Sequence, residues 1–309
     1  MSTVDSPQIR NKRIVITGGA GFIGSHLAEA LVVDNEVVVV DNLSTGDIDH
    51  VPSAAEFIEA DIRDRQLMAM VLEDADLLFH EAAIVSVEQS VDNPEQTQEV
   101  NATATLQLLA LARELSVRMV FASSAAVYGH PESVPISESE PTASSSPYGL
   151  AKLTADQYVK LYADLYDVEA IALRYFNIYG PRQTGGDYSG VIDVFLQQAH
   201  SGGPITVHGD GTQTRDFIHV DDVVQANLRA AAYGEPGMAY NIGTGESISI
   251  LELATLIREI TGNTESVDIE HISARDGDIE QSRADIQRAK TDLGFDPTIR
   301  LPDGLQELI

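Results

Sequence analysis

A tyrosine and a lysine stand four residues apart in the stretch SSPYGLAKLTAD, at positions 148 and 152 of a chain with only four lysines. A helix is expected to follow Pro147 in this stretch, with leucines at helical spacing, and residues four apart on a helix share one face. A free phenol has a pKa of about 10, so a tyrosine that acts as a base near neutrality needs a pKa about 3 units lower. An ammonium at about 4 Å supplies roughly that much at an effective dielectric near 20. Tyr148 and Lys152 are therefore candidate catalytic residues.

Two serines precede this pair at the end of an apolar run, VRMVFASSAAVYG. The run predicts a buried strand that ends at Ser123 and Ser124, directly before the helix of Tyr148. Ligands of doubly wound folds bind at the carboxyl edge of the sheet. We therefore expect these hydroxyls and the tyrosine to meet at one edge.

The stretch RIVITGGAGFIGSHLAEAL places Gly18, Gly21 and Gly24 between a predicted strand and a predicted helix. Glycines allow a tight turn and close approach of the backbone to a diphosphate, and a helix N-terminus favours an anion. Asp41 ends the next strand 20 residues after Gly21, where a carboxylate accepts the adenosine ribose hydroxyls and repels the 2′-phosphate of NADP. The pattern favours NAD, although the glycines could make a tight turn and Asp41 could cap a loop without any ligand.

The elements that position these residues follow a regular order. Short β-branched runs alternate with helical patterns from residue 13 onward: RIVITG, FIGSHLAEALVV, EVVVVD, EFIEAD, DLLFHEAA and VRMVFASS. Alternating buried strands and amphipathic helices predict an α/β fold with a doubly wound parallel sheet. Helices are expected over residues 94–115 and from Pro147. The composition changes near residue 177, which predicts one domain over 1–176, with a return segment near 216–242, and a smaller C-terminal domain over 177–309.

The charge balance excludes several classes of partner. The chain has 48 Asp and Glu against 19 Lys and Arg, a net charge of −29, which repels nucleic acid and anionic lipid. There is no cysteine, no long apolar run and no apolar leader, which predicts a cytoplasmic protein without disulfides. Fifteen of the 19 basic residues are arginine, and with the acidity this suggests adaptation to high salt, although an ordinary acidic cytosolic enzyme stays possible.

Eight motifs, in order, cover nearly the whole chain: TGGAGFIGSHL, DNLSTG, FHEAA, SSAAVYG, YGLAK, RYFNIYGPRQ, GDGTQTRDFIHVDD and ARDGDIEQSRADIQRA. Through them the sequence resembles the extended short-chain dehydrogenase/reductase family, and within it the UDP-glucose (UDP-galactose) 4-epimerases. The resemblance implies a Rossmann domain that holds NAD and a C-terminal domain that binds a nucleotide sugar. It also implies three catalytic residues: Ser124, Tyr148 and Lys152.

The same resemblance implies two sets of binding residues. For NAD they are Gly18, Gly21, Phe22, Ile23, Gly24, Asp41, Asn42, Ser44, Thr45, Gly46, Asp61, Ile62, Ala82, Ala83, Tyr148, Lys152, Tyr175 and Phe176. For the UDP-sugar substrate they are Ser124, Tyr148, Asn177, Val191, Thr206, Val207, His208, Arg215, Arg275, Asp278 and Ser282. Arginines suit a diphosphate because the guanidinium is planar. His208 stands where the family has an apolar aromatic residue.

The implied reaction is a reversible oxidation at C4 of the sugar, followed by reduction from the other face. Nucleotide-sugar 4,6-dehydratases and UDP-glucuronate decarboxylases share the first half, but they place acidic residues after the serine or threonine. This chain has Ala125 and Ala126 there, which favours an epimerase because elimination of water needs an acid. A non-catalytic NAD-binding sensor is the alternative from another class, and the retained Tyr148 and Lys152 argue against it.

Three finer expectations complete the sequence interpretation. The resemblance places Ser282 at the edge of the sugar pocket, where a small residue admits N-acetyl groups, so UDP-GlcNAc and UDP-GalNAc are expected beside UDP-glucose and UDP-galactose. It also implies a homodimer through the leucine faces of residues 94–115 and 147–166. His80, His130, His208 and His219 show no ligand spacing with nearby acids, so no metal site is expected.

Overall fold

The computed structural model describes residues 7–183, 190–263, 267–275 and 277–309. Its main feature is a seven-stranded parallel sheet in the order β11-β6-β5-β4-β1-β2-β3. The strands of this sheet are β1 (Arg13–Thr17), β2 (Glu36–Asp41), β3 (Glu56–Glu59), β4 (Leu77–His80), β5 (Arg118–Ser124), β6 (Ala170–Tyr175) and β11 (Ala239–Ile242). The chain order reverses beside β1, as in a Rossmann fold, so the prediction of a doubly wound α/β fold is confirmed.

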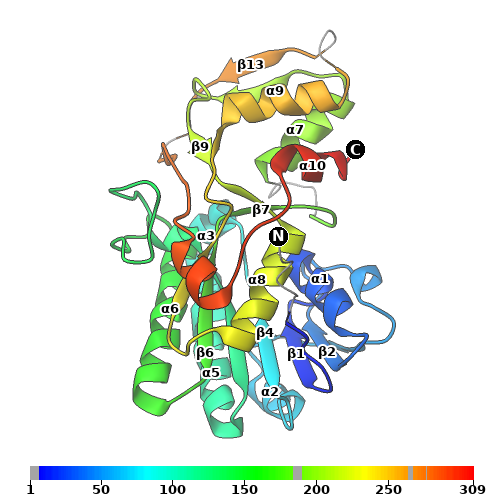
Figure 1. Cartoon of the computed structure of the whole chain (residues 1–309), viewed down its shortest axis with the longest axis vertical. Helices are drawn as coiled ribbons and strands as arrows, with labels where there is room; N and C mark the ends of the chain where they lie inside the picture. Colours follow the sequence, from blue (N-terminus) through cyan, green and yellow to red (C-terminus); the bar gives the residue numbers. More distant parts are fainter. Residues whose placement is uncertain (1–6, 184–189, 264–266, 276) are drawn as a thin grey trace.

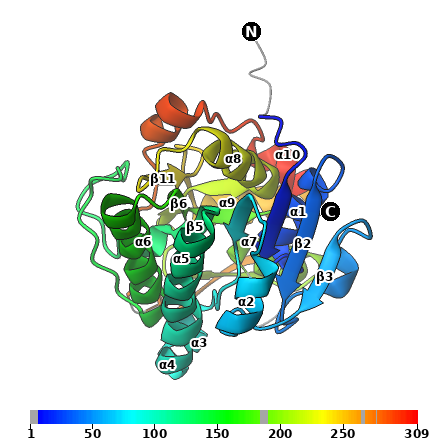
Figure 2. The ribbon, with the colours of Figure 1, turned by 90° about the horizontal axis from the view of Figure 1, so that it is seen from below.

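Helices cover both faces of the sheet, because successive residues of each strand point to opposite faces. Ile14 and Ile16 belong to one core and Val15 to the other, and all three are fully buried. The first core is covered by α1 (Phe22–Leu31) and α8 (Val220–Tyr233), and the second by α2 (Arg65–Val71), α5 (Ala104–Leu115) and α6 (Pro147–Tyr166). Figure 2 shows these layers from below.

The helix expected over residues 94–115 contains a π-helical stretch. It consists of α4 (Pro94–Gln98), a π-helical segment (Glu99–Thr103) and α5, and it follows the short α3 (Val87–Asp92). Asn101, in the π-helical stretch, is buried and binds the backbone of Ile84 twice, accepting from N at 2.8 Å and donating to O at 2.7 Å. The local change of helical period thus fixes the segment that follows β4.

A second, smaller group of elements lies above the carboxyl edge of the sheet in Figure 1. It contains β7 (Asn177–Tyr179), α7 (Val191–His200), β8 (Ile205–His208), β9 (Thr214–Arg215), β10 (Phe217–His219), β12 (Ile248–Ser249), α9 (Ile250–Ile260), β13 (Ile269–Ile272) and α10 (Leu301–Gln306). Phe195, Leu253 and Ile257 are central to its separate core. The domain boundary at residues 176 and 177 stays a prediction, and β6 passes directly into β7 there.

One buried carboxylate joins three segments at the junction of these two groups. Asp216 accepts hydrogen bonds from the backbone N–H groups of Thr244 at 2.8 Å, Gly245 at 3.0 Å and Ala284 at 3.1 Å.

Among the described residues, no helix is both long and apolar enough to cross a bilayer.

Candidate active site

The glycine turn between β1 and α1 is too tight for any side chain. Gly18 has φ +71°, and a Cβ atom there would lie 2.6 Å from the backbone nitrogen of Ala82. A Cβ atom on Gly24 would lie 2.3 Å from the carbonyl oxygen of Gly18. The N-cap of α1 is Gly21, and no side chain caps this end. The first N–H groups of α1, at Phe22 and Ile23, therefore remain available to an anion.

Asp41 is held beside this turn by the backbone. Its carboxylate is 8% exposed and accepts from N–H of Ala20 at 3.1 Å and of Leu43 at 2.8 Å. Gly46 packs against the same carboxylate, because its Cβ position lies 3.0 Å from Oδ1. The structure thus brings Gly18, Gly24, Asp41 and Gly46 together. A tight turn, a free helix end and a fixed carboxylate fit the diphosphate and ribose of NAD.

The other residues expected at the adenosine end differ in accessibility. Asn42, Ser44 and Thr45 are exposed, and Asn42 Oδ1 accepts from N–H of Ser44 at 3.1 Å. Ile62 is 6% exposed and its side chain packs in the sheet core. Asp61 is paired with Arg63, whose Nη2 donates to it at 2.6 Å, and this bond lowers the pKa of the Asp61 carboxyl. Asp61 therefore meets a ligand as one half of an ion pair.

Tyr148 lies in the first turn of α6, which begins at a strong cap. Ser146 Oγ accepts from N–H of Gly149 at 3.1 Å, and Pro147 occupies the first helical position. The Tyr148 backbone N–H donates to Ser90 Oγ at 3.1 Å. Ser124, at the end of β5, lies close enough to the phenol of Tyr148 to influence its pKa. Burial raises the pKa of Tyr148, and the Ser124 side chain opposes that rise.

Lys152 lies one helical turn further and is 3% exposed. Its Nζ donates to the carbonyl oxygen of Ala122 at 2.7 Å and lies 5.0 Å from the ring centre of Phe121. Burial lowers the pKa of Lys152 to about 8. The sequence argument expected Lys152 to lower the pKa of Tyr148, and the structure differs: burial dominates at Tyr148, and the ammonium is bound to the end of β5.

The wall beside Lys152 contains a carboxyl group that sequence reasoning missed. Tyr175, at the end of β6, donates to Glu81 Oε1 at 3.1 Å and accepts from Asn227 Nδ2 at 2.8 Å. Burial raises the pKa of Glu81 to about 7. Ala82 and Ala83 follow, half-buried, and Phe176 is 6% exposed. The position of Glu81, directly after a strand, was a signal in the sequence that could have been used.

The residues expected to hold the substrate diphosphate are partly brought together. Arg215 is paired with Asp278, and its Nη1 also donates to the carbonyl oxygen of Ile279 at 2.7 Å. Asn177 Nδ2 donates to the carbonyl oxygen of Asp216 at 3.2 Å, one residue from Arg215. Arg275 is exposed and has no ion pair with any residue in the described part of the chain.

The residues expected to contact the base and the sugar also differ in how far their side chains are buried. Thr206 and His208 are half-buried on β8, and His208 Nδ1 lies 2.9 Å from the carbonyl oxygen of Ser273. Val207 is fully buried in the smaller core, because strand residues alternate in direction, so its side chain faces away from any ligand. Val191 begins α7 and is half-buried. Ser282 is 7% exposed, and its N–H donates to the carbonyl oxygen of Thr214 at 3.1 Å.

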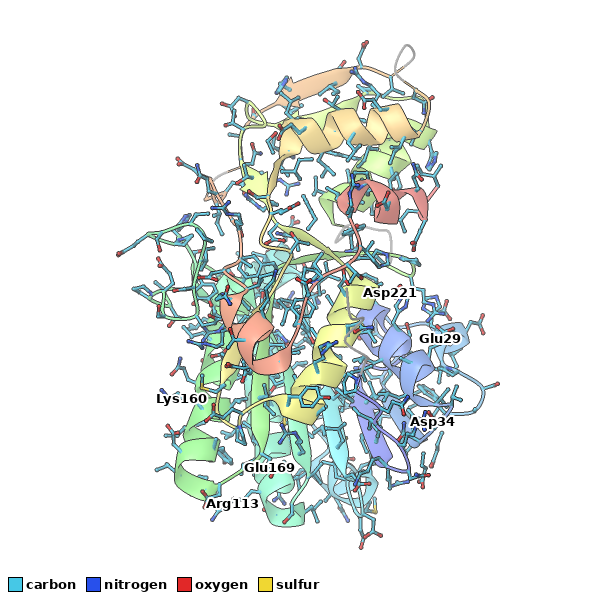
Figure 3. The ribbon with its side chains drawn as sticks, in the orientation of Figure 1. Glu29, Asp34, Arg113, Lys160, Glu169 and Asp221 are labelled. Atoms are coloured by element: carbon cyan, nitrogen blue, oxygen red, sulfur yellow. The ribbon has the colours of Figure 1, made fainter. Side chains whose placement is uncertain are left out.

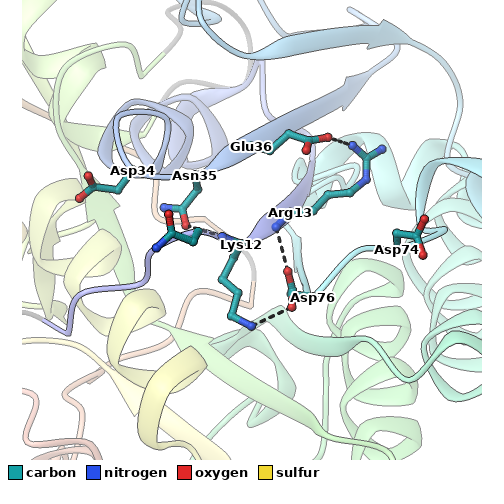
Figure 4. Close-up of a pocket in the computed structure, with 8 residues that line it drawn as sticks. Lys12, Arg13, Asp34, Asn35, Glu36, Asp74 and Asp76 are labelled. Atoms are coloured by element: carbon teal, nitrogen blue, oxygen red, sulfur yellow. Dashed lines mark hydrogen bonds and ion pairs between the residues drawn. The ribbon is translucent and has the colours of Figure 1, made fainter.

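A polar cavity of about 570 Å³ lies at the opposite, amino edge of the sheet (Figure 4). Both of its cations are paired: Lys12 Nζ donates to Asp76 at 2.8 Å, and the Arg13 side chain is bound to Glu36 while its backbone N–H donates to Asp76. Parallel sheets bind ligands at the carboxyl edge. We therefore place the active site at the glycine turn and at Tyr148, not in this cavity.

Comparison with known proteins is decisive for the family. The model of the NAD dependent epimerase/dehydratase family matches residues 14–243. The chain belongs to this epimerase/dehydratase family. Its members use NAD, which agrees with the glycine turn and with Asp41, so the expected cofactor is confirmed.

Relatives within the epimerase/dehydratase family cover almost the whole chain. A putative UDP-glucose 4-epimerase of Methanocaldococcus jannaschii is 39% identical over 301 residues, 96% of this chain and 97% of that protein. A UDP-N-acetylglucosamine 4-epimerase from Methanobrevibacter ruminantium, in complex with UDP-N-acetylmuramic acid, superposes with a TM-score of 0.92 at 34% identity, covering 97% of both chains. A UDP-glucose 4-epimerase from Thermotoga maritima with UDP-glucose has a TM-score of 0.91 at 36% identity, covering 96% of both chains.

The family also contains relatives with other reactions. A UDP-glucuronic acid decarboxylase of Xenopus tropicalis is 34% identical over 96% of this chain and 71% of that protein. A dTDP-glucose 4,6-dehydratase from Streptomyces venezuelae has a TM-score of 0.86 at 30% identity, covering 95% of this chain and 94% of that one. The choice between these reactions therefore depends on individual residues.

Proposed function

We propose that this protein is an NAD-dependent nucleotide-sugar 4-epimerase that acts on UDP-glucose and UDP-galactose, and also on UDP-GlcNAc and UDP-GalNAc. The observation that carries the proposal is that Ser124, Tyr148 and the buried Lys152 come together at the edge of the sheet that carries the glycine turn. The curated and solved relatives named as UDP-sugar 4-epimerases support it.

In the proposed mechanism Tyr148 accepts the proton of the sugar 4-hydroxyl, and Ser124 shares a hydrogen bond with that oxygen. The glycine turn and Asp41 would hold NAD, which when bound would supply the hydride acceptor and donor for C4, so that no net oxidation would occur. The positive charge of Lys152, together with that of bound NAD⁺, would have to favour the ionised phenol against the burial that raises the pKa of Tyr148. Tyr148 returns the proton when the carbonyl is reduced. Lys152 is buried and Tyr148 is half-buried, which limits the access of water to the proton transfer.

The residues after Ser124 favour epimerisation over dehydration or decarboxylation. Ala125 and Ala126 are half-buried at the positions where the alternative reactions need an acid. Ser124 Oγ accepts from N–H of Ala126 at 3.1 Å, so this turn holds the serine without offering a proton donor for a leaving hydroxyl. The keto sugar is therefore left with reduction as its outcome.

The substrate side of the proposal rests on charge and size. Arg215 and Arg275, with Asn177 and Asp278, provide the groups for a nucleotide diphosphate, and two guanidinium groups offset the acidity of the chain. The small Ser282 leaves room for an N-acetyl group. A relative named as a UDP-N-acetylglucosamine 4-epimerase supports that breadth.

The test is an NMR product assay on a panel of UDP and dTDP sugars with added NAD. We expect inversion at C4 of the four UDP sugars, and Tyr148→Phe lowers the rate by about 100-fold to 10,000-fold because it removes the proton acceptor. Formation of a 4-keto-6-deoxy sugar or a pentose would support the alternative reactions. NAD binding with no product from any sugar would support a sensor instead.

Three further expectations stay proposals. A homodimer would cover the exposed apolar side chains of α6, since Leu150, Leu161 and Leu165 are 55%, 44% and 60% exposed. The expected adaptation to high salt is supported by exposed acidic side chains such as Glu29, Asp34 and Glu169, which are labelled in Figure 3. The cytoplasmic location is proposed from the absence of cysteine.

A further inference from the structure

Glu81 is fixed at the centre of the carboxyl edge, although the proposed reaction assigns it no role. It directly follows β4, and its backbone N–H donates to the carbonyl oxygen of Thr17 at 3.1 Å, one residue before the glycine turn. In the pairing of β4 with β5, His80 lies opposite Phe121. Glu81 therefore stands beside Ala122, whose carbonyl oxygen binds the ammonium of Lys152 at 2.7 Å.

Among the described residues, only one of the two carboxyl oxygens of Glu81 has a hydrogen-bond donor. Oε1 accepts from Tyr175, which in turn is held by Asn227. Oε2 is buried and has no hydrogen-bond partner among the described residues. A buried carboxylate oxygen without a donor costs free energy, so a nearby positive charge is needed to retain the ionised form.

The neighbours of Glu81 on β4, β6 and α8 are neutral. Thr105 Oγ1 donates to the carbonyl oxygen of Asn101 at 2.8 Å, so it accepts from His80 Nε2, and His80 Nδ1 then accepts from Thr17 Oγ1 at 2.7 Å. This pattern fixes a neutral imidazole. Tyr175 on β6 and Asn227 on α8 carry no charge, since burial raises the pKa of Tyr175 well above its ordinary value.

The α6 side supplies the charges. Asp156, one turn after Lys152, is neutralised by Arg174, whose Nη2 lies 2.7 Å from Oδ1. Lys152 is bound to a carbonyl oxygen and not to a carboxylate. Glu81 and the Lys152 ammonium therefore both lie beside Ala122, and within the described part of the chain neither has an ion pair with another residue.

We propose that Glu81 is a positioning residue that keeps Lys152 protonated in the catalytic pocket and thereby sets the upper pH limit of the reaction. The inference rests on the proposed function, because Lys152 must be positive to favour the ionised Tyr148. Glu81 acts through Lys152 and is assigned no contact with the substrate.

The direction of the pKa shifts agrees with this pairing. Burial lowers the pKa of Lys152 to about 8, and the Glu81 charge opposes that fall. Burial raises the pKa of Glu81 to about 7, and Lys152 opposes that rise. Loss of the carboxylate therefore lowers the pKa of Lys152, and the ammonium deprotonates at a lower pH.

The four lysines of the chain allow a direct measurement. Lysine labelled with ¹³C at Cε gives four resonances, and the one missing from Lys152→Met is assigned to Lys152. Lys12, Lys160 and Lys290 are not buried. We expect the Lys152 resonance to titrate at least about one pH unit lower in Glu81→Gln than in the unchanged protein, with NAD bound and without it.

Glu73→Gln is the matched control, because it removes the same charge from an exposed position and leaves the Lys152 titration unchanged. Tyr175→Phe is a second variant: it withdraws a hydrogen bond that favours the Glu81 carboxylate, so it shifts Lys152 in the same direction by less. In the epimerase assay, the alkaline limb of kcat/KM for Glu81→Gln moves to lower pH by the shift seen in the NMR titration.

An unchanged Lys152 titration in folded Glu81→Gln, or in Tyr175→Phe should the first variant not fold, overturns the proposal. A shifted lysine resonance with an unmoved alkaline limb overturns its catalytic part. A shifted resonance in a protein that converts no sugar contradicts the proposed function instead, and the pairing of Glu81 with Lys152 then stands without a pH limit to set.

Discussion

Replacing Asp156 by alanine should lower the free energy of unfolding by about 3 to 5 kcal/mol, because it leaves a buried guanidinium without its counter-ion. Asp156 and Arg174 are 4% and 6% exposed as side chains. The Asp156 carboxylate accepts from Arg174 Nε at 3.0 Å and Nη2 at 2.7 Å, and from Ser123 Oγ at 2.7 Å. This loss is a large part of the free energy of unfolding of a typical domain, which is roughly 5 to 15 kcal/mol.

Two comparisons separate the charge effect from lost packing. The double variant Asp156→Leu with Arg174→Met removes both charges at similar volume, and it should cost less than Asp156→Ala alone. Asp296→Ala breaks the exposed pair with Lys290, whose side chains are 74% and 42% exposed, and should cost under about 1 kcal/mol. Urea unfolding followed by circular dichroism measures all three.

The reasoning is refuted if Asp156→Ala costs no more than Asp296→Ala. It is also refuted if the double variant is the least stable of the three, because an apolar replacement would then fail to relieve the uncompensated charge. A confirmed loss would have a functional consequence as well, since Asp156 anchors α6 to β6 one turn after Lys152.

Four further predictions follow from the site and the surface. Gly24→Ala should weaken NAD binding by about tenfold or more in calorimetry, because its Cβ would lie 2.3 Å from a backbone oxygen of the turn; unchanged affinity would contradict this. Ser282→Tyr should reduce activity on N-acetylated sugars relative to plain ones, and an unaltered ratio would remove Ser282 from the sugar pocket. Burial lowers the pKa of His80 to about 3, below the roughly 6.5 of an unfolded histidine. The folded state therefore favours the neutral imidazole, whose contribution to stability is complete above about pH 6.5 and is lost as the pH falls towards 3. Between pH 6.5 and 5 the loss is about 2 kcal/mol by urea unfolding, and His80→Gln should flatten that slope. The unfolding midpoint should rise in molar KCl relative to dilute buffer, and equal midpoints would exclude dependence on high salt.

The parts of the fold predicted well from the sequence depend on local patterns. Alternation of buried strands and helices gave the doubly wound sheet, and the glycine spacing located the turn before α1. Strand alternation could also have placed Val207 in the core, since its half-buried neighbours Thr206 and His208 share the other face. The ion pair between Asp61 and Arg63 could equally have been predicted from the sequence, because the two residues are two positions apart.

The parts that were missed depend on distant contacts. Glu81 and Tyr175 are 94 positions apart, and Ala122 is 30 positions from Lys152. No spacing rule links such pairs, so the sequence could suggest a base near Lys152 but not where the ammonium donates. The raised pKa of Tyr148 also follows from burial by several elements together, which local patterns do not measure.

The last strand of the large sheet comes from late in the chain: β11 pairs with β6, and the helix before it, α8, covers one face. A shortened protein that stopped after Phe176 would lack this strand and this helix, leaving the β6 backbone open along one side. Such a fragment should self-associate and precipitate. An exchange of the smaller group of elements for that of a relative therefore needs two splice points and not a single junction, so that residues near 220–242 stay with the large sheet.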